Sequence, residues 1–210
     1  MPEPPAPTDG GPSPAPEPST ATPGPSAAAP QPLTDPDSAV PDPPDVPPSS
    51  SAPKIHPDVR PLAFLLGRWR GAGVGGYPTI ESFQYGEEII FSHNGKPYLS
   101  YVSRTWLLDA DGRPGRPSHM ETGFWRVAPD GTAEVMLAQP TGITEIYLGE
   151  ITGTKVELAT DVVARTSTAK DVRAGHRLYG LVGQDLAYAH DMAAMGQPLQ
   201  PHLSAQLKRA

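Results

Sequence analysis

Over most of the chain, apolar and polar residues alternate with a period of two. Residues 155–160 read KVELAT, in which apolar side chains alternate with charged or polar ones. Residues 184–192 read QDLAYAHDM, in which leucine, tyrosine, histidine and methionine share one face. Successive side chains of a β-strand point to opposite faces of the sheet, so this pattern predicts half-buried antiparallel strands.

The remaining strands and their turns follow the same pattern and define the fold class. Further strands are expected over residues 81–91, 97–109, 120–128, 133–139, 143–151 and 173–182. Hairpin-type residues separate them, namely Asn94-Gly95, Asp111-Gly112, Asp130-Gly131 and Gly153. Eight to ten short strands with almost no helix between them indicate an antiparallel barrel or sandwich. A closed up-and-down barrel would leave no strand edge exposed and could hold one small ligand, as lipocalins do.

Two short helical segments are expected at the ends of this barrel. Residues 58–66 carry leucines at helical spacing and are followed by Gly67, a residue typical of a helix C-terminus. Near the C-terminus, Leu199, Leu203 and Leu207 recur every fourth residue. This spacing predicts a short terminal helix over residues 197–209, with His202 beside its apolar stripe.

Residues 1–53 differ in composition from the rest of the chain. They hold 19 of the 29 prolines and seven acidic residues, but no lysine, arginine or aromatic residue. Such a segment lacks the apolar mass needed to offset the entropy of ordering. We therefore expect a disordered solubilising tail at 1–53 and one folded domain at 54–210. The alternatives for the tail are a docking peptide for a proline-binding module and a cell-envelope spacer.

Composition also excludes several classes of function. The chain has no cysteine, which excludes disulfide scaffolds, thiolate metal sites and thiol catalysis. The folded part has balanced charge and the tail is acidic, so nucleic acid is not an expected partner. No run of 18 apolar residues and no signal peptide is visible, which makes the cytoplasm the expected location. The histidines match no zinc-protease or serine-hydrolase motif.

Four residues remain as candidates for a binding site, each with an ordinary structural alternative. His202 fits either a metal ligand or a structural histidine. His190 lies either inside the barrel or on an amphipathic outer face. Lys170 is either a solvated cation or the partner of a ligand carboxylate. Thr79 lies in a Tyr-Pro-Thr turn and offers a hydroxyl group.

Seven motifs in register resemble the nitrobindin family, small haem proteins built as ten-stranded antiparallel barrels. In this chain they are GRWRGAG at 67–73, YPTI at 77–80, FSHNGKPY at 91–98, ETG at 121–123, TGITE at 141–145, TAKDV at 168–172 and GQPLQPHL at 196–203. The resemblance covers about residues 57–209 and excludes the tail. Within the first motif, Trp69 is expected to pack in the core and plug one end of the barrel.

The resemblance implies a specific site and activity. Haem b would lie at one end of the barrel, with its iron held by His202 as proximal and catalytic ligand, and with Thr79 and Lys170 beside the porphyrin. The opposite face of the iron would be open to ligands. The implied function is a peroxynitrite isomerase that binds nitric oxide and converts peroxynitrite to nitrate. A homodimer is also implied.

Two other classes of function are weighed against this one. The sequence also departs from the family pattern at Asp171, His190 and Pro201. A barrel of this kind could be a haem-free carrier of a small apolar molecule, or an interaction protein that captures a partner through its tail. His190 stands where an aliphatic residue is usual. If it points inward, it could approach the open face of the iron, and an outward orientation is equally open at this point.

Overall fold

A computed structural model describes residues 53–210. Apart from Pro53, the predicted tail at 1–53 lies outside the described residues, so its disorder and the domain boundary stay predictions. The elements in chain order are η1 (Pro57–Leu65), β1 (Gly67–Tyr77), β2 (Ile80–Ser92), β3 (Leu99–Leu108), β4 (Pro114–Val127), β5 (Ala133–Gln139), β6 (Ile143–Thr152), β7 (Lys155–Arg165), β8 (Val172–Val182), β9 (Asp185–Ala194) and β10 (Gln200–Arg209). No helix in this part of the chain is long and apolar enough to span a bilayer. The cytoplasmic location stays a prediction.

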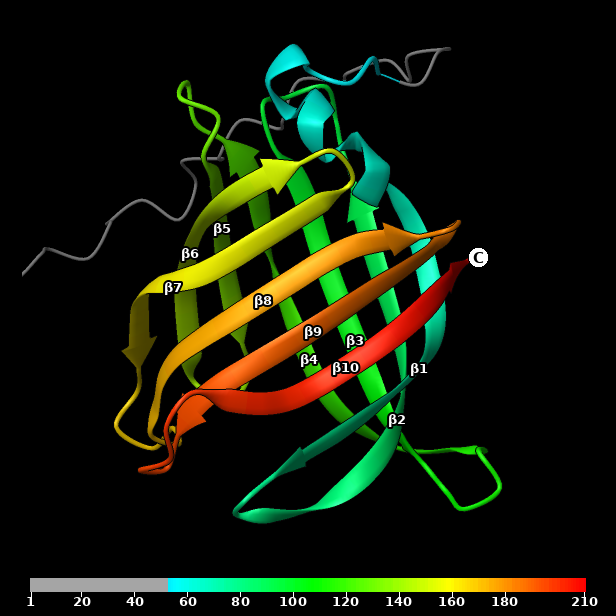
Figure 1. The fold of residues 1–210 in the computed structure, drawn as a ribbon, viewed down its shortest axis with the longest axis vertical. Coiled ribbons are helices and arrows are strands. Elements are labelled where there is room, and N and C mark those ends of the chain that lie inside the picture. The colour runs from blue at the N-terminus through cyan, green and yellow to red at the C-terminus, as the bar shows by residue number, and fades with distance from the viewer. Residues whose placement is uncertain (1–52) are drawn as a thin grey trace, which may run out of the picture. The chain divides into compact units, whose positions relative to one another are not determined.

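The ten strands form a closed antiparallel barrel in the order β1-β10-β9-β8-β7-β6-β5-β4-β3-β2 (Figure 1). Strands adjacent in sequence pair with each other, and the pairing of β1 with β10 closes the wall. Consecutive strands run in opposite directions, so their connections alternate between the two ends of the barrel. The turns after β1, β3, β5, β7 and β9 all lie at the end remote from η1. The predicted up-and-down barrel of about ten strands is confirmed.

The C-terminal segment is a strand, so the helix predicted over residues 197–209 is wrong. Leu203 and Leu207 lie in β10 opposite Gly75 and Gly71 of β1, whereas Leu199 precedes the strand and is half exposed. A spacing of four residues places side chains on the same face of a strand as well as of a helix. Pairing decides between the two, because without β10 both β1 and β9 would have unpaired backbone edges.

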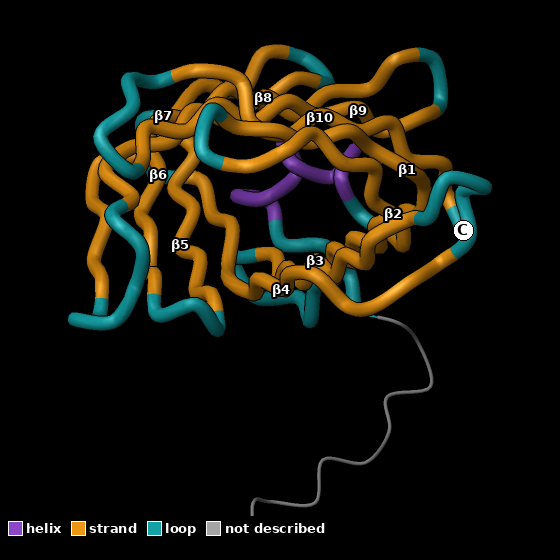
Figure 2. The backbone as a smooth tube through the Cα atoms, turned by 90° about the horizontal axis from the view of Figure 1, so that it is seen from below, coloured by secondary structure: helices purple, strands orange, loops and turns teal. Residues whose placement is uncertain are grey.

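The helix η1 closes one end of the barrel, as Figure 2 shows from the opposite end. It is a 3-10 helix at the predicted place, and its Leu62 and Leu65 are fully buried. Trp69 is also fully buried, and its indole Nε1 donates a hydrogen bond to the carbonyl oxygen of Leu65 at 2.7 Å. The Arg209 guanidinium covers the Trp69 ring at 4.2 Å from its centroid. The packing role expected of Trp69 is confirmed.

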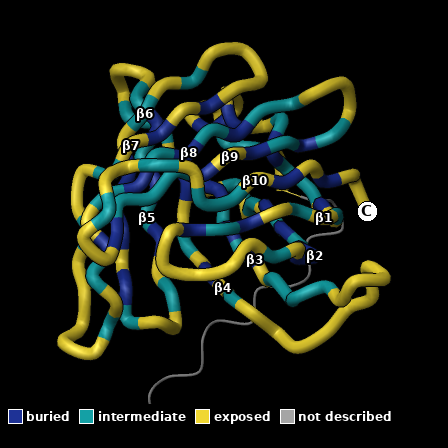
Figure 3. The backbone as a smooth tube through the Cα atoms, turned by 60° about the horizontal axis from the view of Figure 1, so that its bottom comes forward, coloured by how far each residue is buried: buried dark blue, intermediate teal, exposed yellow. Residues whose placement is uncertain are grey.

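The barrel interior combines aromatic side chains with buried charges. Figure 3 shows that buried residues recur along the strands, while the loops are mostly exposed. The buried charged residues are Glu87, Glu121, Glu145 and Arg177. Arg177 donates to both carboxylate oxygens of Glu121 at 2.6 and 3.0 Å and to Glu145 at 3.4 Å. Burial alone would raise the pKa of Glu121, but the Arg177 guanidinium holds this pKa below its usual value.

Glu87 forms a second buried polar group. Its carboxylate accepts hydrogen bonds from Ser103 Oγ at 2.6 Å and from Tyr188 Oη at 2.7 Å. Burial raises the pKa of Glu87 from 4.5 to about 7, even though these two bonds and the more distant charge of Arg177 lower it. The charge of Glu121 adds to the increase.

This raised pKa predicts a pH-dependent stability. The folded state keeps a proton on Glu87 that the unfolded chain releases, so the free energy of unfolding should fall as the pH rises from about 4.5 to about 7. The slope from this one group can reach about 1.4 kcal/mol per pH unit. Urea unfolding of the wild type and of Glu87→Gln across this pH range would measure the difference. Parallel curves for the two proteins would contradict the shift.

Candidate functional site

His202 lies near the start of β10, at the end of the barrel remote from η1. Opposite this segment of β10, Pro201 pairs with Asp191 and Leu203 pairs with His190, so His202 is the extra residue of a β-bulge. Its Nδ1 lies 3.0 Å from the carbonyl oxygen of Gly76 on β1. A carbonyl oxygen only accepts hydrogen bonds, so Nδ1 carries the proton in this contact. In the neutral ring, Nε2 is then the nitrogen with a free lone pair.

The surroundings of His202 keep its ring neutral and oriented. Burial lowers the pKa of His202 despite the opposing effect of the Gly76 hydrogen bond, and the positive charge of Lys170 is among the smaller causes. The Tyr77 ring stands edge-on to the imidazole, with 5.5 Å between centroids. Tyr77 is itself fixed, because its hydroxyl donates to the Met192 carbonyl at 3.0 Å and accepts from the Ala194 amide at 2.8 Å.

A cavity of about 660 Å³ borders His202. Inward residues such as Phe83 and Leu203 line it together with outward ones such as Val74 and Gln84. The cavity therefore follows the edge of the barrel between the β1–β2 hairpin and the β9–β10 wall. Its volume lies within the range of about 300–1,000 Å³ typical of small-molecule sites.

The structure places Thr79 and Lys170 at the same end of the barrel as His202. Thr79 is exposed in the turn between β1 and β2, and Lys170 is exposed between β7 and β8. The Lys170 segment is tied to the β9–β10 connection, because the Met195 amide donates to the Asp171 carbonyl at 2.8 Å. Neither Thr79 nor Lys170 lines the cavity beside His202. Their roles as cofactor-binding residues stay predictions.

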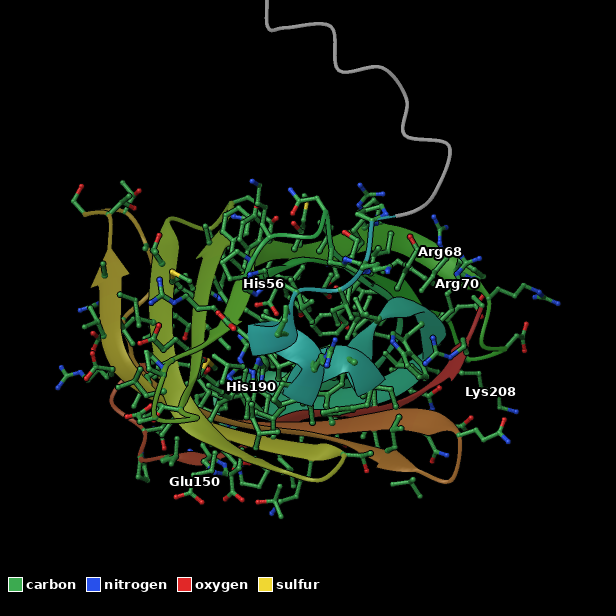
Figure 4. All side chains as sticks on the ribbon, turned by 90° about the horizontal axis from the view of Figure 1, so that it is seen from above. His56, Arg68, Arg70, Glu150, His190 and Lys208 are labelled. Carbon is green, nitrogen blue, oxygen red and sulfur yellow. The ribbon has the colours of Figure 1, made fainter. Side chains whose placement is uncertain are left out.

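His190 points into the barrel, which settles the question that its sequence position left open. It is buried, and its Nε2 has no hydrogen-bond partner among the described residues. Figure 4 shows the His190 side chain inside the wall, whereas Arg68 and Lys208 project from it. Burial holds the pKa of His190 well below its usual value, so the ring is neutral. The His190 and His202 rings come from neighbouring strands and lie 5.9 Å apart, so His190 lies beside His202 and not across the barrel from it.

Two groups at this site were not predicted from the sequence. The carbonyl of Gly76, which orients His202, is a backbone group, and no side-chain pattern could reveal it. Tyr77 belongs to the turn motif around Thr79, but its contacts with Met192 and Ala194 are more than 110 residues distant in sequence. Only the closure of β1 against β10 brings these groups together.

This arrangement suits a single nitrogen ligand for a metal centre at the rim of the barrel. The ring is neutral, its Nδ1 is held by a carbonyl, and its Nε2 is free to coordinate, as in most histidine metal ligands. No group of three or more candidate metal-ligating side chains occurs among residues 53–210. One imidazole beside a cavity therefore fits a prosthetic group such as haem, which supplies the other iron ligands itself.

Comparison with known proteins agrees with this chemistry. The family described as "THAP4-like, heme-binding beta-barrel domain" matches residues 58–209. Among curated proteins, the peroxynitrite isomerase of Frankia casuarinae is 56% identical over 169 residues, covering 77% of this chain and 90% of the relative. The ferric nitrobindin-like protein of Thermobifida fusca is 45% identical over 171 residues, covering 74% of this chain and 96% of the relative.

A solved structure has the same architecture. The crystal structure of Rv2717c from M. tuberculosis superposes with a TM-score of 0.68 at 44% sequence identity. The match covers 75% of this chain and 99% of the other. The similarity thus extends over the barrel that carries His202 and its neighbours.

Proposed function

Because this chain belongs to the THAP4-like heme-binding β-barrel family, we propose that it is a haem b protein that isomerises peroxynitrite to nitrate and binds nitric oxide. The observation that carries the proposal is the hydrogen bond between His202 Nδ1 and the Gly76 carbonyl. It leaves Nε2 of a neutral imidazole free beside a cavity, as a proximal haem ligand requires. When bound, ferric haem would supply a Lewis-acidic iron that activates the peroxide bond of the substrate.

Several residues around His202 would hold this cofactor, each through a different contact. His202 would bind the iron, while Gly76 and Tyr77 fix the plane of its ring. Lys170, exposed at the same end of the barrel, would pair with a haem propionate in a charge-assisted bond. Thr79 would contact the porphyrin from the turn between β1 and β2. His190 lies on the same wall as His202, so its role would be to pack beside the proximal ligand.

The activity can be tested with haem-loaded protein mixed with peroxynitrite. We expect faster decay than in buffer and a larger share of nitrate relative to nitrite, whereas the haem-free protein should match buffer. In the ferrous form, addition of nitric oxide should change the visible spectrum. A protein that stays colourless during haem titration would instead support the carrier of a small apolar ligand.

The outer face of the barrel supports the further proposal of a homodimer. Phe124, Met136, Ile146 and Val162 lie opposite one another across β4, β5, β6 and β7. Phe124 is 49% exposed and Val162 is 45% exposed. Three of these four side chains are exposed and Met136 is half-buried, and an apolar row of this kind is typical of an interaction surface. In a two-fold dimer, both protomers would contribute this row to the interface, so each of these residues would occur there twice.

Replacement of Phe124 by serine tests this interface. Because the substitution occurs once in each protomer, we expect the dissociation constant of the dimer to rise by at least about tenfold, equivalent to about 1.4 kcal/mol. Light scattering after size-exclusion chromatography would report the mass over a dilution series. Val182→Ser, an exposed apolar residue outside the row, serves as the control. A wild type that stays monomeric at high concentration would refute the dimer.

A further inference from the structure

Six of the seven tyrosines are buried, and the proposed function uses only Tyr77 among them. Three of the others donate a hydrogen bond from the phenol to a buried carboxylate: Tyr188 to Glu87 at 2.7 Å, Tyr101 to Glu121 at 2.6 Å and Tyr147 to Glu145 at 2.9 Å. A phenol that loses an electron becomes a strong acid and must release its proton. A base within hydrogen-bonding distance makes that release possible.

The three carboxylates differ in their capacity to take up this proton. Glu121 and Glu145 both form ion pairs with the Arg177 guanidinium, which holds the pKa of Glu121 below its usual value. Glu87 forms no ion pair with any residue of the described part of the chain, and its partners are the hydroxyl groups of Ser103 and Tyr188. Of the three carboxylates, Glu87 is therefore the strongest candidate to accept the phenolic proton. Its phenolic donor is Tyr188.

Tyr188 belongs to a buried aromatic cluster and shares a strand with His190, the neighbour of His202. It lies two residues before His190 on the inward face of β9. Its ring stacks on Tyr179 with 5.3 Å between centroids and an interplanar angle of 24°, and Tyr179 contacts Trp125 at 5.3 Å. The Tyr85 and Tyr188 hydroxyls are 2.6 Å apart. These oxidisable rings are packed closely and shielded from solvent, so a radical formed here is protected from quenching.

We propose that Tyr188 is a redox-active residue that reduces one-electron oxidants arising at the His202 site, with Glu87 as its proton acceptor. With nitrogen dioxide as the oxidant, the phenolic O–H bond breaks. The electron reduces nitrogen dioxide to nitrite, the proton passes to the Glu87 carboxylate, and Tyr188 becomes a neutral phenoxyl radical. Nitrogen dioxide forms when the O–O bond of peroxynitrous acid breaks homolytically. The inference rests on the proposed function for this source of oxidant.

The experiment uses the full-length protein without haem, at a pH above about 7 where the Glu87 carboxyl is ionised, and nitrogen dioxide generated by pulse radiolysis of nitrate. We expect a transient phenoxyl absorption, and freeze-quenched samples should show a tyrosyl signal in electron paramagnetic resonance. Tyr188→Phe should remove most of the long-lived signal. Glu87→Gln keeps a hydrogen-bond acceptor but no base, so it should slow oxidation of Tyr188 by about a hundredfold, the low end of what a positioned base contributes. Circular dichroism checks that each variant is folded.

Tyr98→Phe is the matched control, because the Tyr98 hydroxyl is bonded to Asn94 and not to a carboxylate. It should leave the long-lived signal unchanged. Equal radical yields and lifetimes in the wild type and Tyr188→Phe would overturn the proposal, as would equal oxidation rates in the wild type and Glu87→Gln. If these variants do not fold, the positions of nitrotyrosine in the oxidised wild type are mapped instead. Nitration of Tyr98 alone would overturn the proposal.

The same measurements separate this inference from the proposed function. A Tyr188 radical in the haem-free protein, together with a haem-loaded protein that does not isomerise peroxynitrite, would leave the inference standing and refute the function. Isomerisation without any Tyr188 radical would refute the inference alone.

Discussion

Replacement of Arg177 by methionine should destabilise the barrel by about 3–5 kcal/mol, the usual effect of removing one partner of a buried ion pair. The Arg177 side chain is only 5% exposed and bridges Glu121 and Glu145. Methionine can fill much of the space but leaves two buried carboxylates without a counter-charge. Urea unfolding at neutral pH, followed by tryptophan fluorescence, would measure the change in the free energy of unfolding.

Arg173→Met is the matched control on the same strand. Arg173 is 71% exposed, and within residues 53–210 it pairs only with Asp171, so its loss should cost less than about 1 kcal/mol. The double variant Arg177→Met with Glu121→Gln should recover part of the stability lost in Arg177→Met, because it removes one uncompensated charge. Similar losses of stability in Arg177→Met and Arg173→Met would show that the buried ion pairs of Arg177 stabilise the barrel no more than an exposed ion pair does.

The sequence predicts most of the fold because apolar and polar residues alternate over much of the length of the strands. Residues 184–192 are a clear case: Leu186, Tyr188 and His190 share the inward face of β9, as their spacing indicates. The pattern fails in β10, where the bulge at His202 interrupts the alternation. A four-residue leucine spacing then fits either a helix or a strand. Only the requirement that β1 and β9 find a partner selects the strand.

The burial of Glu87, Glu121 and Glu145 could not be predicted from the sequence, and the reason is different. Glu87, Glu121 and Glu145 occupy inward positions where the period-two pattern leads one to expect apolar side chains. Their burial depends on hydrogen bonds with residues of other strands, such as the bond between Tyr188 and Glu87, which are 101 residues apart. Such pairings follow from strand order and register and cannot be read from local composition.

The candidate site was predictable in its residues but not in its geometry. The motifs identified His202, Thr79 and Lys170, and the antiparallel topology brings all three to one end of the barrel. The partner of His202 is a backbone carbonyl 126 residues away. The inward orientation of His190 required the register of β9, which the sequence left open.

His202→Gly should weaken haem binding and change the visible spectrum of the haem that still binds. The substitution removes the imidazole whose Nε2 is free beside the cavity, and no other histidine in the described residues has both a carbonyl partner on Nδ1 and a position on this cavity. Loss of an iron ligand should lower haem affinity by at least about 10–100-fold, since even outer-shell partners of metal sites contribute that much. A haem titration followed by visible absorption would measure the affinity. His190→Ala, which removes the neighbouring ring, should retain an axially ligated haem.

The most direct test of the account is the visible spectrum of haem-loaded His202→Gly before and after addition of imidazole. If the ring of His202 is the iron ligand, free imidazole should occupy the space it leaves and restore the wild-type ferric spectrum, together with peroxynitrite isomerisation. A His202→Gly protein with the wild-type spectrum and activity in the absence of imidazole would contradict the assignment and place the iron on another residue.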